Sequence, residues 1–124
     1  MHSDDRSHAA ALTAHRAVLG AAGGDALPDR PWQHAGQPPS DCDLVRLAAW
    51  KASELEVDPE VVTAGLALLG AARSELDQAE AALLFAARAA GVTFQQIGAA
   101  LGLGSGQAAQ QRMSRVLARL ESRP

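Results

Sequence analysis

The sequence is poor in aromatic residues, and this scarcity limits the kind of core that the chain can build. Tyrosine is absent, and Phe and Trp together make up 3% of the 124 residues. The hydrophobic fraction of 48% is supplied mainly by Ala, Leu and Val, while β-branched residues are scattered. Small and unbranched apolar side chains favour close-packed helices over strands. We therefore expect an all-α fold.

Cysteine is equally scarce. Cys42 stands alone, which excludes an intramolecular disulfide and a zinc site built from cysteines. No apolar run approaches the roughly 20 residues of a membrane span, and the N-terminus lacks the basic start and apolar segment of a signal peptide. These absences predict a soluble cytoplasmic protein that does not bind membranes. The histidines lack metal-ligand spacing, so we expect no metal and no cofactor: they are His2, His8, His15 and His34.

Catalytic constellations are missing as well. The acidic run between residues 54 and 60 surrounds a helix start and does not form a catalytic pair, and Cys42 has no neighbouring base. The glycines at 102, 104 and 106 follow no strand and lack the lysine of a phosphate-binding loop. We expect no enzyme.

The charge of the chain is distributed unevenly. Its net charge is −3, but residues 1–91 hold seven basic and thirteen acidic side chains, whereas residues 92–124 hold four arginines and only Glu121 as an acid. The second segment therefore carries +3. Since a polyanion responds to the field within about 10 Å at ordinary salt, the acidic total does not exclude nucleic acid as a partner.

Residues 1–40 predict an Ala-rich helix over 7–19 followed by a Gly/Pro-rich linker over 20–40, with Trp32 as its anchor. Asp41 is expected to cap a helix that runs to about Glu56. Its predicted inward face consists of Leu44, Leu47, Ala48 and Leu55, and Trp50 is expected to pack as well.

Asp58 and Pro59 give a strong helix start, and the helical pattern continues to Ala90, with Gly91 as the C-cap. Whether 59–90 is one helix, or two that break near residues 71–74, stays open at this point. Large and small residues alternate at a seven-residue spacing along it, which suits either an ordinary core or a pair of helices from two copies. The residues at the seven-residue spacing are Val62, Leu69, Leu76, Leu83 and Ala90. Three residues after each of the first four stands a small residue, namely Gly65, Ala72, Ala79 and Ala86.

The C-terminal quarter has the pattern of two short helices joined by a glycine-rich turn. Thr93 is the expected N-cap of a helix from Phe94 to about Leu101, and Ser105 the N-cap of the last helix. The apolar residues of these two helices are expected to face inward: Phe94, Ile97 and Leu101 in the first, then Ala109, Met113, Val116, Leu117 and Leu120. Glutamine, serine and arginine remain for the outward face of the last helix, which is what a reader of the major groove needs.

This segment resembles the helix-turn-helix of small actinobacterial DNA-binding proteins and, more loosely, region 4 of sigma factors. The turn is one residue longer than the commonest one, and Gly106 stands where many relatives have a basic residue. The match covers about residues 74–120. The matching positions are Ile97, Gly98, Leu101, Gly102, Leu103, Ser105, Gln107, Ala108, Ala109, Gln111 and Arg112.

We therefore expect a C-terminal tri-helical helix-turn-helix domain over 74–124, accessory helices over 41–73, and an N-terminal helix and linker over 1–40. The predicted function is binding of double-stranded DNA in the nucleoid, as a transcriptional regulator or nucleoid-associated protein, by a homodimer formed through 59–90. The alternative is a protein-interaction module that pairs through 59–90 and has no DNA role. The predicted DNA contacts are Thr93, Gln95, Gln96, Ser105, Gly106, Gln107, Gln110, Gln111, Arg112, Ser114, Arg115 and Arg119.

Overall fold

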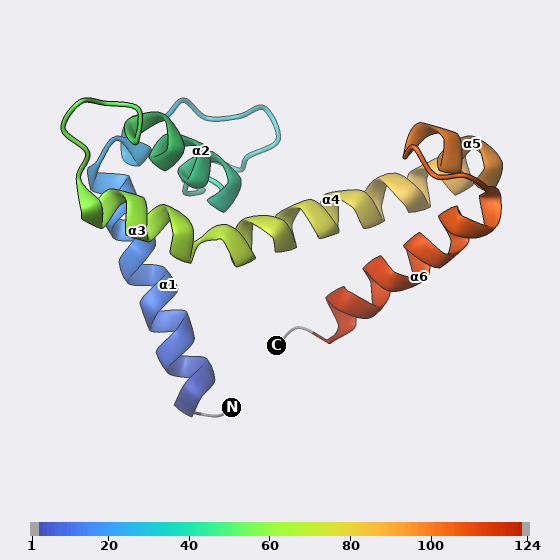
Figure 1. Ribbon diagram of the computed structural model, residues 1–124, viewed down its shortest axis with the longest axis horizontal. Coiled ribbons are helices and arrows are strands. Elements are labelled where there is room, and N and C mark those ends of the chain that lie inside the picture. The colour runs from blue at the N-terminus through green and yellow to red at the C-terminus, as the bar shows by residue number, and fades with distance from the viewer. Residues whose placement is uncertain (1–2, 123–124) are drawn as a thin grey trace. The chain divides into compact units, whose positions relative to one another are not determined.

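The computed structural model describes residues 3–122, and every regular element within them is helical (Figure 1), which confirms the all-α prediction. None of the described helices is long and apolar enough to cross a membrane. The elements are α1 (Ser3–Ala21), the 3₁₀-helix η1 (Gly24–Ala26), α2 (Asp41–Lys51), α3 (Pro59–Ala67), α4 (Leu69–Ala89), α5 (Phe94–Ala100) and α6 (Gly106–Glu121).

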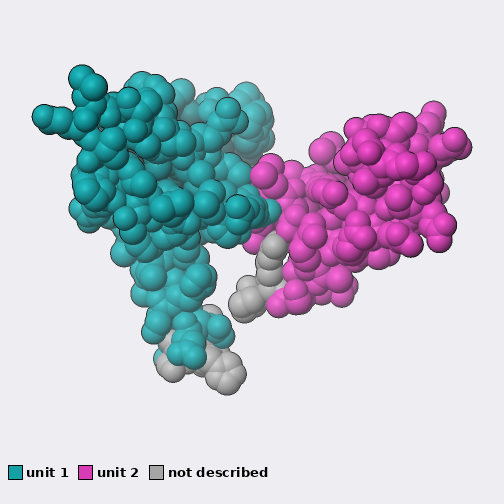
Figure 2. Space-filling model, in the orientation of Figure 1, with its two compact units in different colours: residues 1–73 teal, residues 74–124 magenta. Residues whose placement is uncertain are grey.

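The chain divides into two compact units (Figure 2), Met1–Arg73 and Ser74–Pro124. The second unit starts at the residue where the sequence pattern places the start of the C-terminal domain. Residues 1–40 and 41–73, treated as separate regions in the sequence, belong to one unit.

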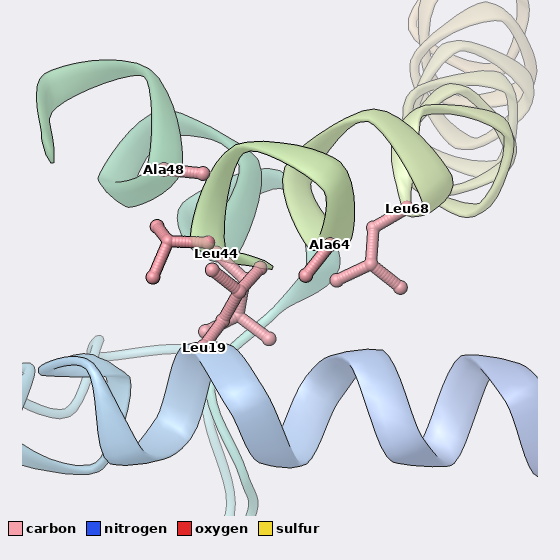
Figure 3. Packing of buried hydrophobic residues seen from close by; sticks show 6 residues of the cluster. Leu19, Leu44, Ala48, Ala64 and Leu68 are labelled. Atoms are coloured by element: carbon pink, nitrogen blue, oxygen red, sulfur yellow. The ribbon is translucent and has the colours of Figure 1, made fainter. Parts of the chain in front are cut away.

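The core of the first unit lies where α1, α2 and α3 meet. Leu19 and Leu68 are fully buried and belong to one cluster with Leu44 and Ala64 (Figure 3). An ion pair joins α1 to α2 in the same unit. Both carboxylate oxygens of Asp41 accept hydrogen bonds from the Arg16 guanidinium, at 2.7 and 2.8 Å. Asp41 is only 8% exposed, and its charge is compensated by this pair of hydrogen bonds.

Several predictions for the first unit are wrong. The N-cap of α2 is Ser40, whose hydroxyl accepts from the Asp43 N–H at 3.1 Å, while Asp41 is already inside the helix. The helix ends at Lys51 and not near residue 56, since the Ser53 hydroxyl donates to the Trp50 carbonyl and offers the backbone a turn instead of another helical bond. Leu55 is consequently outside the helix and fully exposed.

The two tryptophans are not packing anchors. Trp32 is 78% exposed and Trp50 66% exposed. The linker is fastened by a polar side chain instead, because Gln33 accepts from the Arg30 N–H and donates to the Pro38 carbonyl. A glutamine that bonds to the backbone of its own loop replaces the apolar anchor expected there.

The segment 59–90 forms two helices. Asp58 caps α3 by accepting from the Glu60 N–H at 2.9 Å, with Pro59 in the first turn, as predicted. The break lies at Leu68 and not near residues 71–74, and it is slight, since the Leu68 carbonyl still accepts from the Ala72 N–H at 2.9 Å. The predicted end of α4 at Gly91 is confirmed, because Gly91 has φ 85° and follows the last helical turn.

The second unit contains α4 from residue 74 onward, α5 and α6. Its core is formed by Leu84, Ile97 and Ala109, one residue from each helix, and Val116 is fully buried as well. A complete capping box starts α5: the Thr93 hydroxyl accepts from the Gln96 N–H, and the Gln96 side chain accepts from the Thr93 N–H. The inward position predicted for Leu101 is wrong, because this C-cap residue is 39% exposed and Leu103 is half-buried in its place.

The alternating stripe of 59–90 has two different surroundings. In the first unit Gly65 and Ala72 are buried and Leu69 is half-buried, so this part belongs to the core. In the second unit Leu76 and Leu83 are 62% and 71% exposed. The stripe is therefore core only in its first half.

Candidate nucleic-acid interface

The start of α6 is fixed by a very close approach to α5. A Cβ atom added to Gly98 would lie 2.6 Å from the carbonyl oxygen of Ser105, and one added to Gly106 would lie 3.0 Å from the backbone nitrogen of Gln95. Both neighbours are backbone atoms, so neither can rotate away. The two glycines thus allow the two helices to meet backbone to backbone.

This contact changes the interpretation of Gly106. The sequence predicts Gly106 as a DNA contact, at a position where many relatives have a basic residue. In the structure it is half-buried and its missing side chain makes room for α5. A basic side chain at this position would crowd Gln95, so Gly106 is explained by packing within the unit.

Ser105 caps α6 as predicted. Its hydroxyl accepts from the Ala108 N–H at 3.1 Å. Thr93 and Gln96, two other predicted DNA contacts, accept hydrogen bonds from each other's backbone N–H groups in the capping box. These three side chains have a structural task at the helix starts, whereas Gln95 is exposed on α5.

The outward face of α6 is polar and carries no carboxylate over residues 107–115, while Glu121 lies on the same side at the end of the helix. Its side chains follow one another at spacings of three, one, three and one residue, which keeps them on one side of a helix. All are exposed and together they line a shallow depression of the surface, while Ala109 and Val116 on the opposite side are fully buried. They are Gln107, Gln110, Gln111, Ser114 and Arg115.

Two of the predicted arginines are turned toward α4. Arg112 donates to both oxygens of Glu80 at 2.8 and 2.9 Å, in a pair whose side chains are 35% and 19% exposed. These hydrogen bonds and the charge of Glu80 raise the pKa of Arg112 above its ordinary value. Arg119 donates to Asp77 at 3.3 and 3.2 Å. The earlier arginine of α6 thus pairs with the later carboxylate of α4, and the later arginine with the earlier carboxylate. The two helices therefore run antiparallel here.

These ion pairs revise the charge of the last segment. Its +3 came from four arginines and Glu121, but Asp77 and Glu80 lie before residue 92 in the chain and beside α6 in the fold. Arg123 lies outside the described residues. Among the arginines of α6, Arg115 is the one for which the described residues supply no carboxylate partner.

Asp77 and Glu80 were missed as members of the site. The available signal was their position on α4, since Glu80 lies one turn before the buried Leu84 and thus on the side of the helix that faces the core. Arg88 was also missed. Its guanidinium lies 4.2 Å from the centre of the Phe94 ring and donates to the Val92 carbonyl at 2.9 Å, which fastens the turn before α5.

Comparison of the chain with protein-family models, with curated proteins and with solved structures finds no match in any of the three. Within residues 3–122, no group of three or more His, Cys, Asp or Glu side chains is arranged to hold a metal ion.

Proposed function

We propose that the second unit binds double-stranded DNA, with α5 and α6 acting as a helix-turn-helix and α6 as the reading helix. The observation that carries the proposal is the outward face of α6 over residues 107–115, an exposed row of amide, hydroxyl and guanidinium groups without a carboxylate. The major groove admits an α-helix, and glutamine amides pair with the N6 and N7 edge of adenine. Arg115 is suited to a phosphate or to the O6 and N7 atoms of guanine.

The construction of the unit supports this assignment. The face begins directly after the Ser105 cap, where free backbone N–H groups favour a phosphate. It lies opposite the buried side of α6, so its residues can contact DNA without unfolding the core. The sequence resemblance to small actinobacterial DNA-binding proteins covers the same helices and suggests a transcriptional regulator or nucleoid-associated protein.

A single copy should bind weakly. With Arg112 and Arg119 held by α4, one unpaired arginine remains among the described residues of the reading helix. Each neutralised phosphate contributes about 0.9 to the salt slope on B-DNA, so one copy should show a shallow slope. We propose that two copies bind together, each placing one α6 on a half-site.

The test is a fluorescence-anisotropy titration of a labelled 30-bp duplex pool of mixed sequence at several salt concentrations. We expect Arg115→Ala to weaken binding about tenfold and to reduce the salt slope by about 1, since it removes a phosphate or base contact. Arg46→Ala is the matched control, because Arg46 is an exposed arginine of α2 in the other unit and its loss removes the same charge. Selection of bound sequences from the pool then tests the glutamines, as Gln110→Ala should relax base preference with little effect on the salt slope.

Equal loss of binding in Arg115→Ala and Arg46→Ala would show a response to net charge alone and would refute the proposed face. No binding by the unmodified chain at low salt would refute the DNA proposal itself. The other candidate function is a protein-interaction module, which the exposed apolar residues of α4 favour. If the chain does not bind DNA, pairing through α4 is the function that we would propose for the second unit.

A further inference from the structure

The exposed side of α4 in the second unit carries an apolar strip that the proposed DNA face does not use. Its members are spaced by three, four and three residues, which places them on one side of the helix. Leu76 and Leu83 are 62% and 71% exposed, and the alanines between and beyond them are exposed as well. We define this apolar strip as Leu76, Ala79, Leu83 and Ala86.

The strip has defined limits. One turn before it, Ala72 is buried in the first unit and its carbonyl accepts from the Cys42 thiol. Along its side, Asp77 and Glu80 pair with arginines of α6, so these two charges are directed away from the strip, while Glu75 lies at its edge one turn before Ala79. The four members of the strip are themselves uncharged and extend over about 16 Å, the length of an 11-residue helical segment.

We infer that the occupant of this strip is a second copy of the chain, with the two α4 helices antiparallel. An interface between identical copies must be complementary to itself. The strip reads Leu, Ala, Leu, Ala at spacings of three, four and three residues. When a second copy lies antiparallel to the first, each leucine meets an alanine, so the strip is complementary to itself. Leu76 of one copy then faces Ala86 of the other, and Ala79 faces Leu83.

The pairing of a large with a small residue at every position lets two helices approach to the 8–10 Å of ordinary helix packing. It also explains why the sequence alternates there although neither leucine fills the core of its own unit. Because the four members of the strip are apolar, they favour an equally apolar surface as their partner.

The size of the strip sets the strength of the dimer. A surface about 16 Å long and no wider than the roughly 10 Å of a helix is far below the about 800 Å² per partner of a standard stable interface. The dimer should therefore be weak and transient. Binding of two half-sites on one duplex would strengthen it, because the second contact becomes intramolecular.

The antiparallel arrangement also separates the two proposed reading faces. In each copy α5 and α6 follow the C-terminal end of α4, and these ends lie at opposite ends of the pair. The dimer itself does not rest on DNA binding. Its test is made without DNA, so the two proposals succeed or fail separately.

The association is measured by sedimentation equilibrium of the full chain from about 1 μM to about 1 mM, the range of weak complexes. We expect the mass to rise from one copy to two. Leu83→Glu should shift the association to at least about tenfold higher concentration, because it places a charge in the apolar contact. Gln78→Glu is the control on the same helix, since it adds the same charge at a position about 140° around the helix axis from Leu83. It should leave association unchanged.

Register is tested by cysteine pairing in a Cys42→Ser background. An equimolar mixture of Ala79→Cys and Leu83→Cys chains should form the mixed disulfide faster than either chain forms a disulfide alone. A constant single-copy mass, equal association of Leu83→Glu and Gln78→Glu, or faster pairing within one variant would each overturn the inference. Helical content by circular dichroism checks that both glutamate variants are folded, which is expected because both positions are exposed.

Discussion

Gly98→Ala tests the contact on which the proposed helix-turn-helix geometry depends. The added Cβ would lie 2.6 Å from the Ser105 carbonyl oxygen and 3.2 Å from the carbonyl carbon. Contacts between an aliphatic carbon and a carbonyl oxygen normally reach about 3.3–3.6 Å. The start of α6 must therefore move away from α5 by about 0.7 Å if the methyl group is to fit.

The free-energy change has two opposing parts. Overpacking of this kind destabilises by about 1–3 kcal/mol, and the upper half of that range applies because the obstacle is backbone. Alanine in place of glycine inside a helix returns about 0.8–1 kcal/mol. The net expectation for Gly98→Ala is a loss of about 1–2 kcal/mol in the free energy of unfolding.

The matched control is Gly104→Ala, in the turn of the same unit. Gly104 has no heavy atom within 4 Å of the added Cβ and no positive φ. Alanine there restricts the unfolded chain and should change stability by about 0 to +1 kcal/mol. Urea unfolding followed by far-ultraviolet circular dichroism measures both. If Gly98→Ala were as stable as Gly104→Ala, the backbone contact between α5 and α6 would be refuted.

Two further substitutions probe one contact in each unit by the same urea assay. Ser105→Ala removes the acceptor for the Ala108 N–H and should cost about 1 kcal/mol, whereas Ser105→Asp should retain stability as another good cap; equal loss in both would contradict the capping role. Asp41→Ala leaves Arg16 without its carboxylate and should cost about 1–2 kcal/mol, the side chain of Arg16 being open enough for water to take over part of the bond. A change below about 0.5 kcal/mol would show that the pair is only a surface contact.

The features that the sequence predicted well are those set by near neighbours. Asp58, Thr93 and Ser105 are helix caps in the structure, because a cap is a bond between a side chain and an N–H two or three residues later. The two faces of α6 follow from the same local geometry, since its apolar residues recur with the helical period. Ala109 and Val116 are accordingly buried.

The features that were predicted wrongly depend on distant parts of the chain or on a choice between competing bonds. Trp32 is the predicted anchor of the linker, but it is exposed, and the loop is held by hydrogen bonds of Gln33. Leu55 continued the apolar pattern of α2 in sequence, although the helix had already ended at Lys51. In both cases burial depends on where the backbone goes, and a side-chain pattern does not contain that information.

The arginines of α6 show why charge counted by segment misleads. Arg112 and Glu80 are 32 residues apart, so a division of the sequence at residue 92 assigns them to opposite sides of the balance. In the fold they neutralise each other, and Asp77 does the same for Arg119. The positive charge of the last helix is thus used largely to hold α6 on α4. A polyanion would have to compete with Glu80 and Asp77 for these two arginines. In the proposed complex, affinity and specificity therefore come mainly from hydrogen bonding by the glutamines and from the pairing of two copies.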